Sequence, residues 1–119
     1  PHHFADVQAA VDEMARVSGN VALVVDNLYR GDVVEEAERL RDPTHVRNYS
    51  EEEWRKFFER AGLEVEAVEL LDTDIDLEAW LTRAGCEGEE AERVRSLLAD
   101  RVDEGRLAMT RIALKGRKR

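Results

Sequence analysis

Residues 21–27 have the sequence Val21-Ala22-Leu23-Val24-Val25-Asp26-Asn27. An unbroken apolar run of this length predicts a strand that is buried on both faces, as in the parallel sheets of α/β proteins. The run ends abruptly in Asp26 and Asn27, and open α/β sheets bind ligands at the carboxyl ends of their strands. We therefore expect an α/β protein in which these two residues either contact a ligand or form the turn after the strand.

The rest of the chain alternates between helical and strand patterns. Apolar residues at helical spacing predict helices over residues 7–17, 31–40, 51–61, 77–84 and 89–102. Alternating apolar and acidic residues predict a second strand over 63–71, near a sheet edge, and a third strand is expected over 107–114. Ser50 and Glu53 have the spacing of a capping box, which marks the start of the third helix. The fold class expected is thus α/β, with three strands and flanking helices.

Composition restricts the classes of partner. The chain has 119 residues, enough for one domain, and a net charge of −9. An acidic surface repels phosphates and anionic lipids, so we expect no nucleic-acid partner and no membrane association. The single cysteine, Cys86, excludes an intrachain disulfide and suits the reducing cytoplasm, and we expect it to be structural. The basic residues 115–119 are expected to form a solvated end that limits edge pairing after the last strand.

Four segments together carry a family resemblance. They are Pro1-His2-His3-Phe4-Ala5-Asp6, the helix with Glu13-Met14-Ala15-Arg16-Val17, the strand 21–27, and Leu40-Arg41-Asp42-Pro43-Thr44-His45-Val46-Arg47-Asn48-Tyr49-Ser50 followed by Trp54 and Ala61-Gly62-Leu63. In this order they resemble class I S-adenosylmethionine-dependent methyltransferases of the type 11 group, related to the enzymes of ubiquinone and menaquinone biosynthesis. The chain departs from that group in having Ser18-Gly19-Asn20 where Pro-Gly-Gly is usual.

The resemblance implies the C-terminal half of a Rossmann-like fold, whose final antiparallel strand lies beside the fifth strand. In that family a Gly-rich turn after the first strand and an acid after the second hold S-adenosylmethionine, and neither is present in this sequence. Since the chain also starts at Pro1, just before a dense motif, we expect a fragment of a larger methyltransferase domain. The intact protein would methylate a small-molecule acceptor, whereas the fragment alone would be inactive.

The alternative is a non-catalytic binding or oligomerisation module derived from a methyltransferase fold. A sheet that lacks its first half exposes a bare strand edge and apolar surface, and such surfaces favour association. On either hypothesis we expect the fragment to self-associate.

Candidate site residues come from two segments. The resemblance implies that His2, His3 and Phe4 line the methyl-transfer site, where a histidine would position the acceptor or act as a base. The alternative is that they are ordinary terminal residues. No metal site is predicted, because His45 is the only other histidine and no cysteine cluster accompanies it.

The polar connection at 41–49 is the second segment, with candidate acceptor-binding residues Arg41, Asp42, His45, Arg47 and Tyr49. Arginine binds carboxylates and phosphates in a bidentate manner, and a tyrosine stacks or donates a hydrogen bond. The alternative is an internal loop network, in which Asp42 pairs with Arg47 and the backbone satisfies His45.

Overall fold

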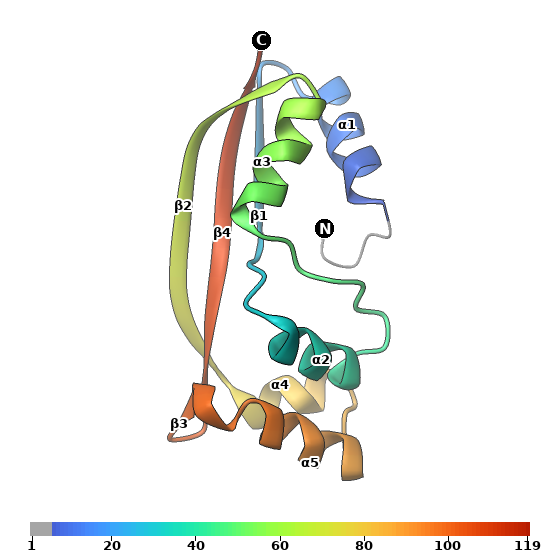
Figure 1. Cartoon of the computed structure of the whole chain (residues 1–119), viewed down its shortest axis with the longest axis vertical. Coiled ribbons are helices and arrows are strands. Elements are labelled where there is room, and N and C mark those ends of the chain that lie inside the picture. The colour runs from blue at the N-terminus through green and yellow to red at the C-terminus, as the bar shows by residue number, and fades with distance from the viewer. Residues whose placement is uncertain (1–5) are drawn as a thin grey trace.

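The computed structural model describes residues 6–119 as an elongated molecule of 49 × 24 × 21 Å (Figure 1). Along the chain the elements are α1 (Val7–Val17), β1 (Val21–Asn27), α2 (Asp32–Arg41), α3 (Glu51–Arg60), β2 (Leu63–Asp76), α4 (Leu77–Arg83), α5 (Gly88–Leu97), a 3₁₀ turn (Ala99–Arg101), β3 (Val102–Asp103) and β4 (Arg106–Lys118). The predicted helices and strands are all present. The last predicted helix ends earlier than expected, because residues 102–103 form β3 instead.

The sheet has the order β1-β4-β2, so the last strand lies between the other two long strands. β4 is antiparallel to both neighbours. Its Leu114 lies opposite Val24 of β1 on one side and opposite Val68 of β2 on the other. The short β3 pairs only with β4. The α/β class and the antiparallel last strand beside the strand at 21–27 are therefore confirmed.

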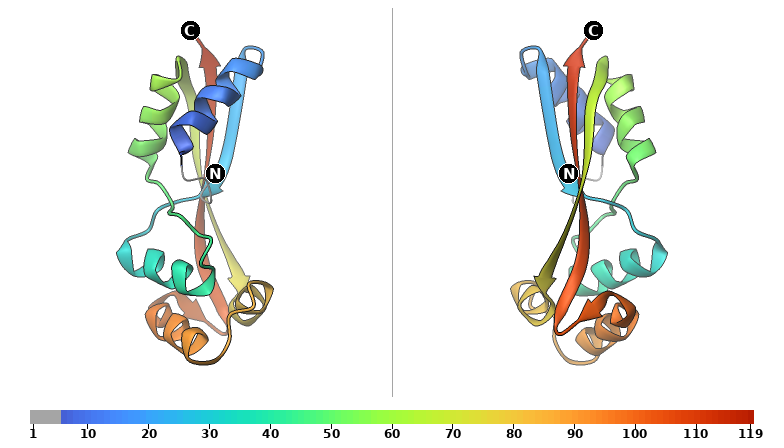
Figure 2. Two further views of the ribbon diagram at one scale, coloured as in Figure 1. Left: turned by 90° about the vertical axis from the view of Figure 1, so that its right-hand side faces the viewer. Right: turned by 90° about the vertical axis from the view of Figure 1, so that its left-hand side faces the viewer.

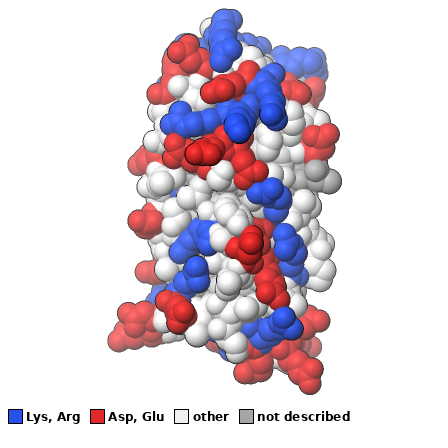
Figure 3. Space-filling model, viewed as in Figure 1, with Lys and Arg blue, Asp and Glu red and all other residues white. Residues whose placement is uncertain are grey.

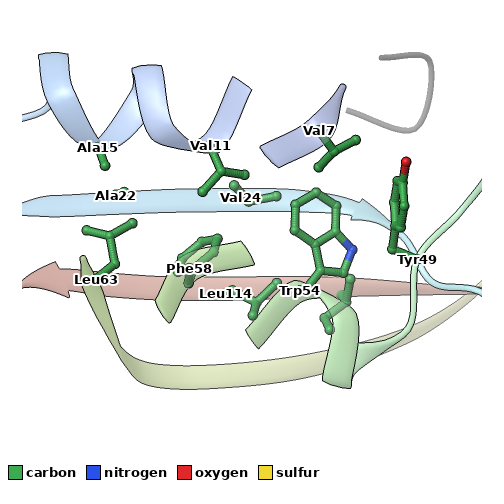
Figure 4. Packing of buried hydrophobic residues seen from close by; sticks show 11 residues of the cluster. Val7, Val11, Ala15, Ala22, Val24, Tyr49, Trp54, Phe58, Leu63 and Leu114 are labelled. Atoms are coloured by element: carbon green, nitrogen blue, oxygen red, sulfur yellow. The ribbon is translucent and has the colours of Figure 1, made fainter. Parts of the chain in front are cut away.

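At the upper end of the molecule in Figure 1, one face of the sheet packs against α1 and α3 and forms the upper core (Figure 4). Trp54 and Phe58 of α3 are fully buried, and they meet Val11 of α1 and Leu114 of β4 in one apolar cluster. The predicted capping box begins α3: the Ser50 hydroxyl accepts a hydrogen bond from the Glu53 amide, and the Glu53 carboxylate accepts one from the Ser50 amide. These local contacts satisfy amides that a helix start otherwise leaves unpaired.

A second apolar core lies at the other end of the molecule, where α2, α4 and α5 gather around the lower part of β4 (Figure 2). Trp80, Leu81 and Val94 are its large buried side chains, and Leu107 of β4 joins them. Within residues 6–119, the long β2–β4 ribbon and the connections after β1 and α2 join the two cores.

β1 is buried on one face only, so the prediction that both of its faces are covered is wrong for this chain. Ala22, Val24 and Asp26 are buried, whereas Val21, Leu23 and Val25 are 38%, 63% and 41% exposed. The reason is that α1 and α3 pack on the same side of the sheet, and no other described element covers the opposite side. We call that opposite side the open face.

The basic C-terminal segment is also placed differently from the prediction. Residues 115–118 continue β4 between its two neighbours instead of forming a solvated end. Lys115 and Arg117 project onto the open face, where both pair with Glu66 of β2. Cross-strand pairing with a carboxylate explains why a basic segment is stable within the sheet.

Within residues 6–119, the helices are all too short or too polar to cross a lipid bilayer.

Candidate functional site

The carboxyl end of β1 is where the chain brings polar residues together. Asp26 is buried, and its Oδ1 accepts a hydrogen bond from the Asn27 amide at 2.8 Å. Immediately beyond, Leu28 forms a parallel bridge with Tyr49, and the Tyr29 amide donates to the Tyr49 carbonyl at 2.9 Å. The connection at 42–50 therefore lies against the end of β1, as the topology of an α/β ligand site requires.

Tyr49 belongs to the upper core rather than to the loop surface. Its ring is 8% exposed and makes edge-to-face contacts with Trp54 and Phe57, at centroid distances of 5.8 and 5.2 Å. The Arg47 guanidinium lies 4.6 Å from the centre of the same ring. Burial raises the pKa of the Tyr49 hydroxyl, although Arg47 acts in the opposite direction. Tyr49 is therefore protonated at neutral pH and suited to donate a hydrogen bond, not to act as a base.

The ion pair expected between Asp42 and Arg47 is not the one that the structure shows. Arg47 binds Glu53 at 2.8 Å, and its Nε donates to the Asn48 carbonyl at 3.0 Å. The Oδ1 of Asp42 accepts hydrogen bonds from both the amide and the hydroxyl of Thr44, at 3.0 and 2.7 Å. A short aspartate prefers such a local turn, so that prediction was wrong.

Arg41 lies away from Arg47 and Tyr49. Its Nε donates to the Trp80 carbonyl at 3.0 Å, and its guanidinium stacks 4.2 Å from the centre of that indole. Arg41 thus holds α2 to α4 in the lower core. Cys86 lies nearby with its thiol 3.8 Å from the Leu40 carbonyl, and burial together with Glu90 raises its pKa, as expected for a structural cysteine.

His45 lies in a buried cluster with two carboxylates of α2. Its Nε2 is 3.1 Å from Glu35 Oε2 and 3.2 Å from Glu38 Oε2. The Asn48 side-chain amide donates to Glu38 at 2.6 Å, and the Asn48 backbone amide donates to Glu35 at 3.0 Å. All four residues are at most 7% exposed. The structure thus gives the Nε2 of His45 two carboxylate partners, which were not expected from the sequence.

Glu35, Glu38 and Asn48 were not predicted from the sequence to belong to a site. A signal was present, because residues three apart on a helix lie on the same side, and Glu35 and Glu38 flank the buried Ala37. His2, His3 and Phe4 lie outside the described residues.

Comparison with known proteins identifies the fold. No protein-family model matches the chain. The chain is 33% identical over 112 residues to YcgJ of Bacillus subtilis, an uncharacterised methyltransferase, covering 88% of this chain and 44% of that protein. The crystal structure of YcgJ superimposes with a TM-score of 0.86 at 28% identity, over 99% of this chain and 60% of that one. The chain has the fold of part of a methyltransferase.

Two further proteins are similar to the chain. BH2331 of Bacillus halodurans, which has a provisional methyltransferase name, superimposes with a TM-score of 0.85 at 25% identity, over 98% of this chain and 60% of that one. YafE of Escherichia coli, an uncharacterised protein, is 33% identical over 89 residues, which are 69% of this chain and 43% of YafE. The chain therefore spans a little under half the length of the curated relatives that it matches.

Proposed function

We propose that the chain is the trailing part of an S-adenosylmethionine-dependent methyltransferase that acts on a small-molecule acceptor. The observation that carries this proposal is the superposition on YcgJ over 99% of the chain. The strand order β1-β4-β2, with a reversed central strand, supports the class I assignment that the sequence motifs imply. The single cysteine, which is free, supports the cytoplasm as the compartment.

The acceptor would bind at the carboxyl end of β1. Asp26, Asn27, Arg47 and Tyr49 converge there, and Tyr49 offers a neutral hydroxyl as a hydrogen-bond donor. A sulfonium methyl group is already electrophilic, so transfer depends mainly on holding the acceptor in line. We retain His2 and His3 as the groups that would position the acceptor or remove its proton.

S-adenosylmethionine would be held by the N-terminal half of the methyltransferase domain, which we call the leading half and which would pack on the open face. Two observations support this arrangement. The curated relatives are more than twice as long as the segment that they share with this chain. The open face also displays Leu23 and Val25 of β1, 63% and 41% exposed, which is apolar surface of the kind that another layer covers. The chain alone would then be inactive.

The second candidate function is a non-catalytic oligomerisation module, which the same open face favours. A shallow hollow of about 210 Å³ lies there, lined by Leu23, Ala67, Glu69, Ala113, Leu114 and Lys115. A second copy of the chain could cover this surface in place of a leading half. On the side of the molecule that carries α3, acidic and basic side chains are interspersed (Figure 3).

Transfer of a labelled methyl group tests the first candidate. The intact protein is incubated with methyl-tritiated S-adenosylmethionine and the small-molecule fraction of a cell extract. We expect label to appear in an organic compound that passes an ultrafiltration membrane, and not when the protein is heat-inactivated. Transfer only to protein or nucleic acid, or no transfer, would contradict the proposal.

A further inference from the structure

We propose that Glu35, Glu38 and His45 bind a divalent transition-metal ion, a property that does not depend on the proposed methyl transfer. Each residue offers one ligand atom, and these three atoms lie within 4.8 Å of one another. Two carboxylate oxygens and one imidazole nitrogen form a mixed set suited to Zn²⁺ or Mn²⁺.

The spacing of the ligand atoms fits a metal ion. The His45 Nε2 lies 3.1 and 3.2 Å from the two carboxylate oxygens. Ligands at about 2.0 Å from a tetrahedral Zn²⁺ are roughly 3.3 Å apart, and cis ligands of an octahedral ion with bonds near 2.1 Å are roughly 3.0 Å apart. The two distances from His45 match both coordination shells to within a few tenths of an ångström, and the two carboxylate oxygens lie within 4.8 Å of each other.

Charge and burial also suit a cation. The side chains of Glu35, Glu38 and His45 are 4%, 7% and 3% exposed. Burying two carboxylates side by side is costly unless positive charge compensates them. A divalent cation balances both, and a neutral imidazole completes the ligand set. The Arg39 guanidinium also approaches Glu35, at 3.8 Å.

Asn48 supplies the outer contacts that metal ligands usually have. Its side-chain amide donates to Glu38, and its backbone amide donates to Glu35, so both carboxylates are held in place. Asn48 is 1% exposed, yet its Oδ1 has no hydrogen-bond partner in the described part of the chain. The side-chain amide of Asn48 is therefore committed to holding Glu38, and a water molecule or solvent ion would complete the coordination of the metal.

The proposed metal site would link a helix to the connection that follows it. Glu35 and Glu38 come from α2, whereas His45 and Asn48 come from the connection at 42–50. A bound ion would therefore fix this connection to α2, one residue before Tyr49 at the end of β1. The competing explanation is a hydrogen-bonded triad that shares protons and binds no metal, and the experiment distinguishes the two.

The test is a metal titration of the chelator-treated chain, with ZnCl₂ and MnCl₂ in separate calorimetric runs. We expect one ion per chain, and a loss of affinity of at least about tenfold in E38Q and in H45Q. The matched control is E36Q, because Glu36 lies on the same helix, its side chain is 47% exposed, and it pairs with Arg93 at the surface. Its affinity should equal that of the wild type.

Thermal unfolding gives a second readout that does not require activity. The ion should raise the Tm of the wild type and of E36Q but not that of E38Q. If E38Q fails to fold, the wild-type titration and H45Q still decide the question. Absence of saturable binding by the wild type would overturn the proposal. So would binding that E38Q and H45Q leave unchanged, as expected for an ion held at the His2–His3 end.

Discussion

Gly116 of β4 lies directly beneath the ring of Phe58 in α3. A Cβ atom at position 116 would lie 2.6 Å from Cδ2 and 2.9 Å from Cε2 of that ring. Phe58 is fully buried, so it has little room to move away. The absence of a side chain at this position therefore allows α3 to approach the sheet closely.

The first prediction follows from this contact. G116A should destabilise the chain by about 1–3 kcal/mol, because the added methyl group overpacks the upper core. Urea unfolding measures the change. The control is G19A, since a Cβ at Gly19 meets nothing within 4 Å, and its effect should be within about 0.5 kcal/mol. Equal stability of the two variants would contradict this account of the packing.

The second prediction concerns the open face. L23K in the isolated chain should abolish self-association, because a charge at this position cannot be buried against a second copy. Sedimentation velocity should give an oligomer for the wild type and a monomer for L23K. V17K is the matched control, because Val17 is 65% exposed but lies on α1, and it should behave like the wild type.

The same substitution distinguishes the two candidate functions. If a leading half covers the open face, L23K should lower the Tm of the intact protein clearly more than V17K does. If the chain is an oligomerisation module, L23K should disrupt the assembly of the intact protein while its Tm at low concentration changes little. A monomeric wild-type chain at every concentration would contradict the expected self-association.

The third prediction is a pH dependence. Hydrogen bonds from Arg95 lower the pKa of the Glu78 carboxyl, which joins α4 to α5. Since the folded pKa is lower than the unfolded one, the stabilisation is present above the unfolded pKa and is lost as pH falls through the folded value. R95Q should therefore have a lower Tm than the wild type at neutral pH, and the difference should shrink in acid.

The control for this prediction is K56Q. Lys56 is exposed on α3 and forms no ion pair with the described residues. Its Tm difference from the wild type should not follow the titration of Glu78. A difference between R95Q and wild type that stays constant down to low pH would show that the ion pair does not stabilise the fold.

Features that depend on neighbouring residues could be predicted from the sequence. The Ser50–Glu53 box is a local contact, and the helical spacing of Trp54 and Phe58 marks the buried side of α3. The extension of β4 to Lys118 could not be predicted, because it depends on pairing with strands far away in the sequence. The same holds for β1, whose apolar run does not show which face is covered.

The candidate site shows the same limit. The position of Asp26 and Asn27 at the end of a strand follows from a local pattern. The choice of Glu53 over Asp42 as the partner of Arg47 follows only from how the connection folds. Glu35 and Glu38 resemble solvated residues of a charged helix, and they become buried only because the connection at 42–50 folds back onto α2.

The central claim is that this chain supplies the acceptor side of a methyltransferase whose cofactor is held by another part of the same protein. Calorimetric titration of S-adenosylmethionine into the intact protein and into the isolated chain, side by side, tests it most directly. We predict saturable binding by the intact protein and no measurable heat of binding for the chain alone. Equal binding by both, or no binding by the intact protein, would contradict the claim.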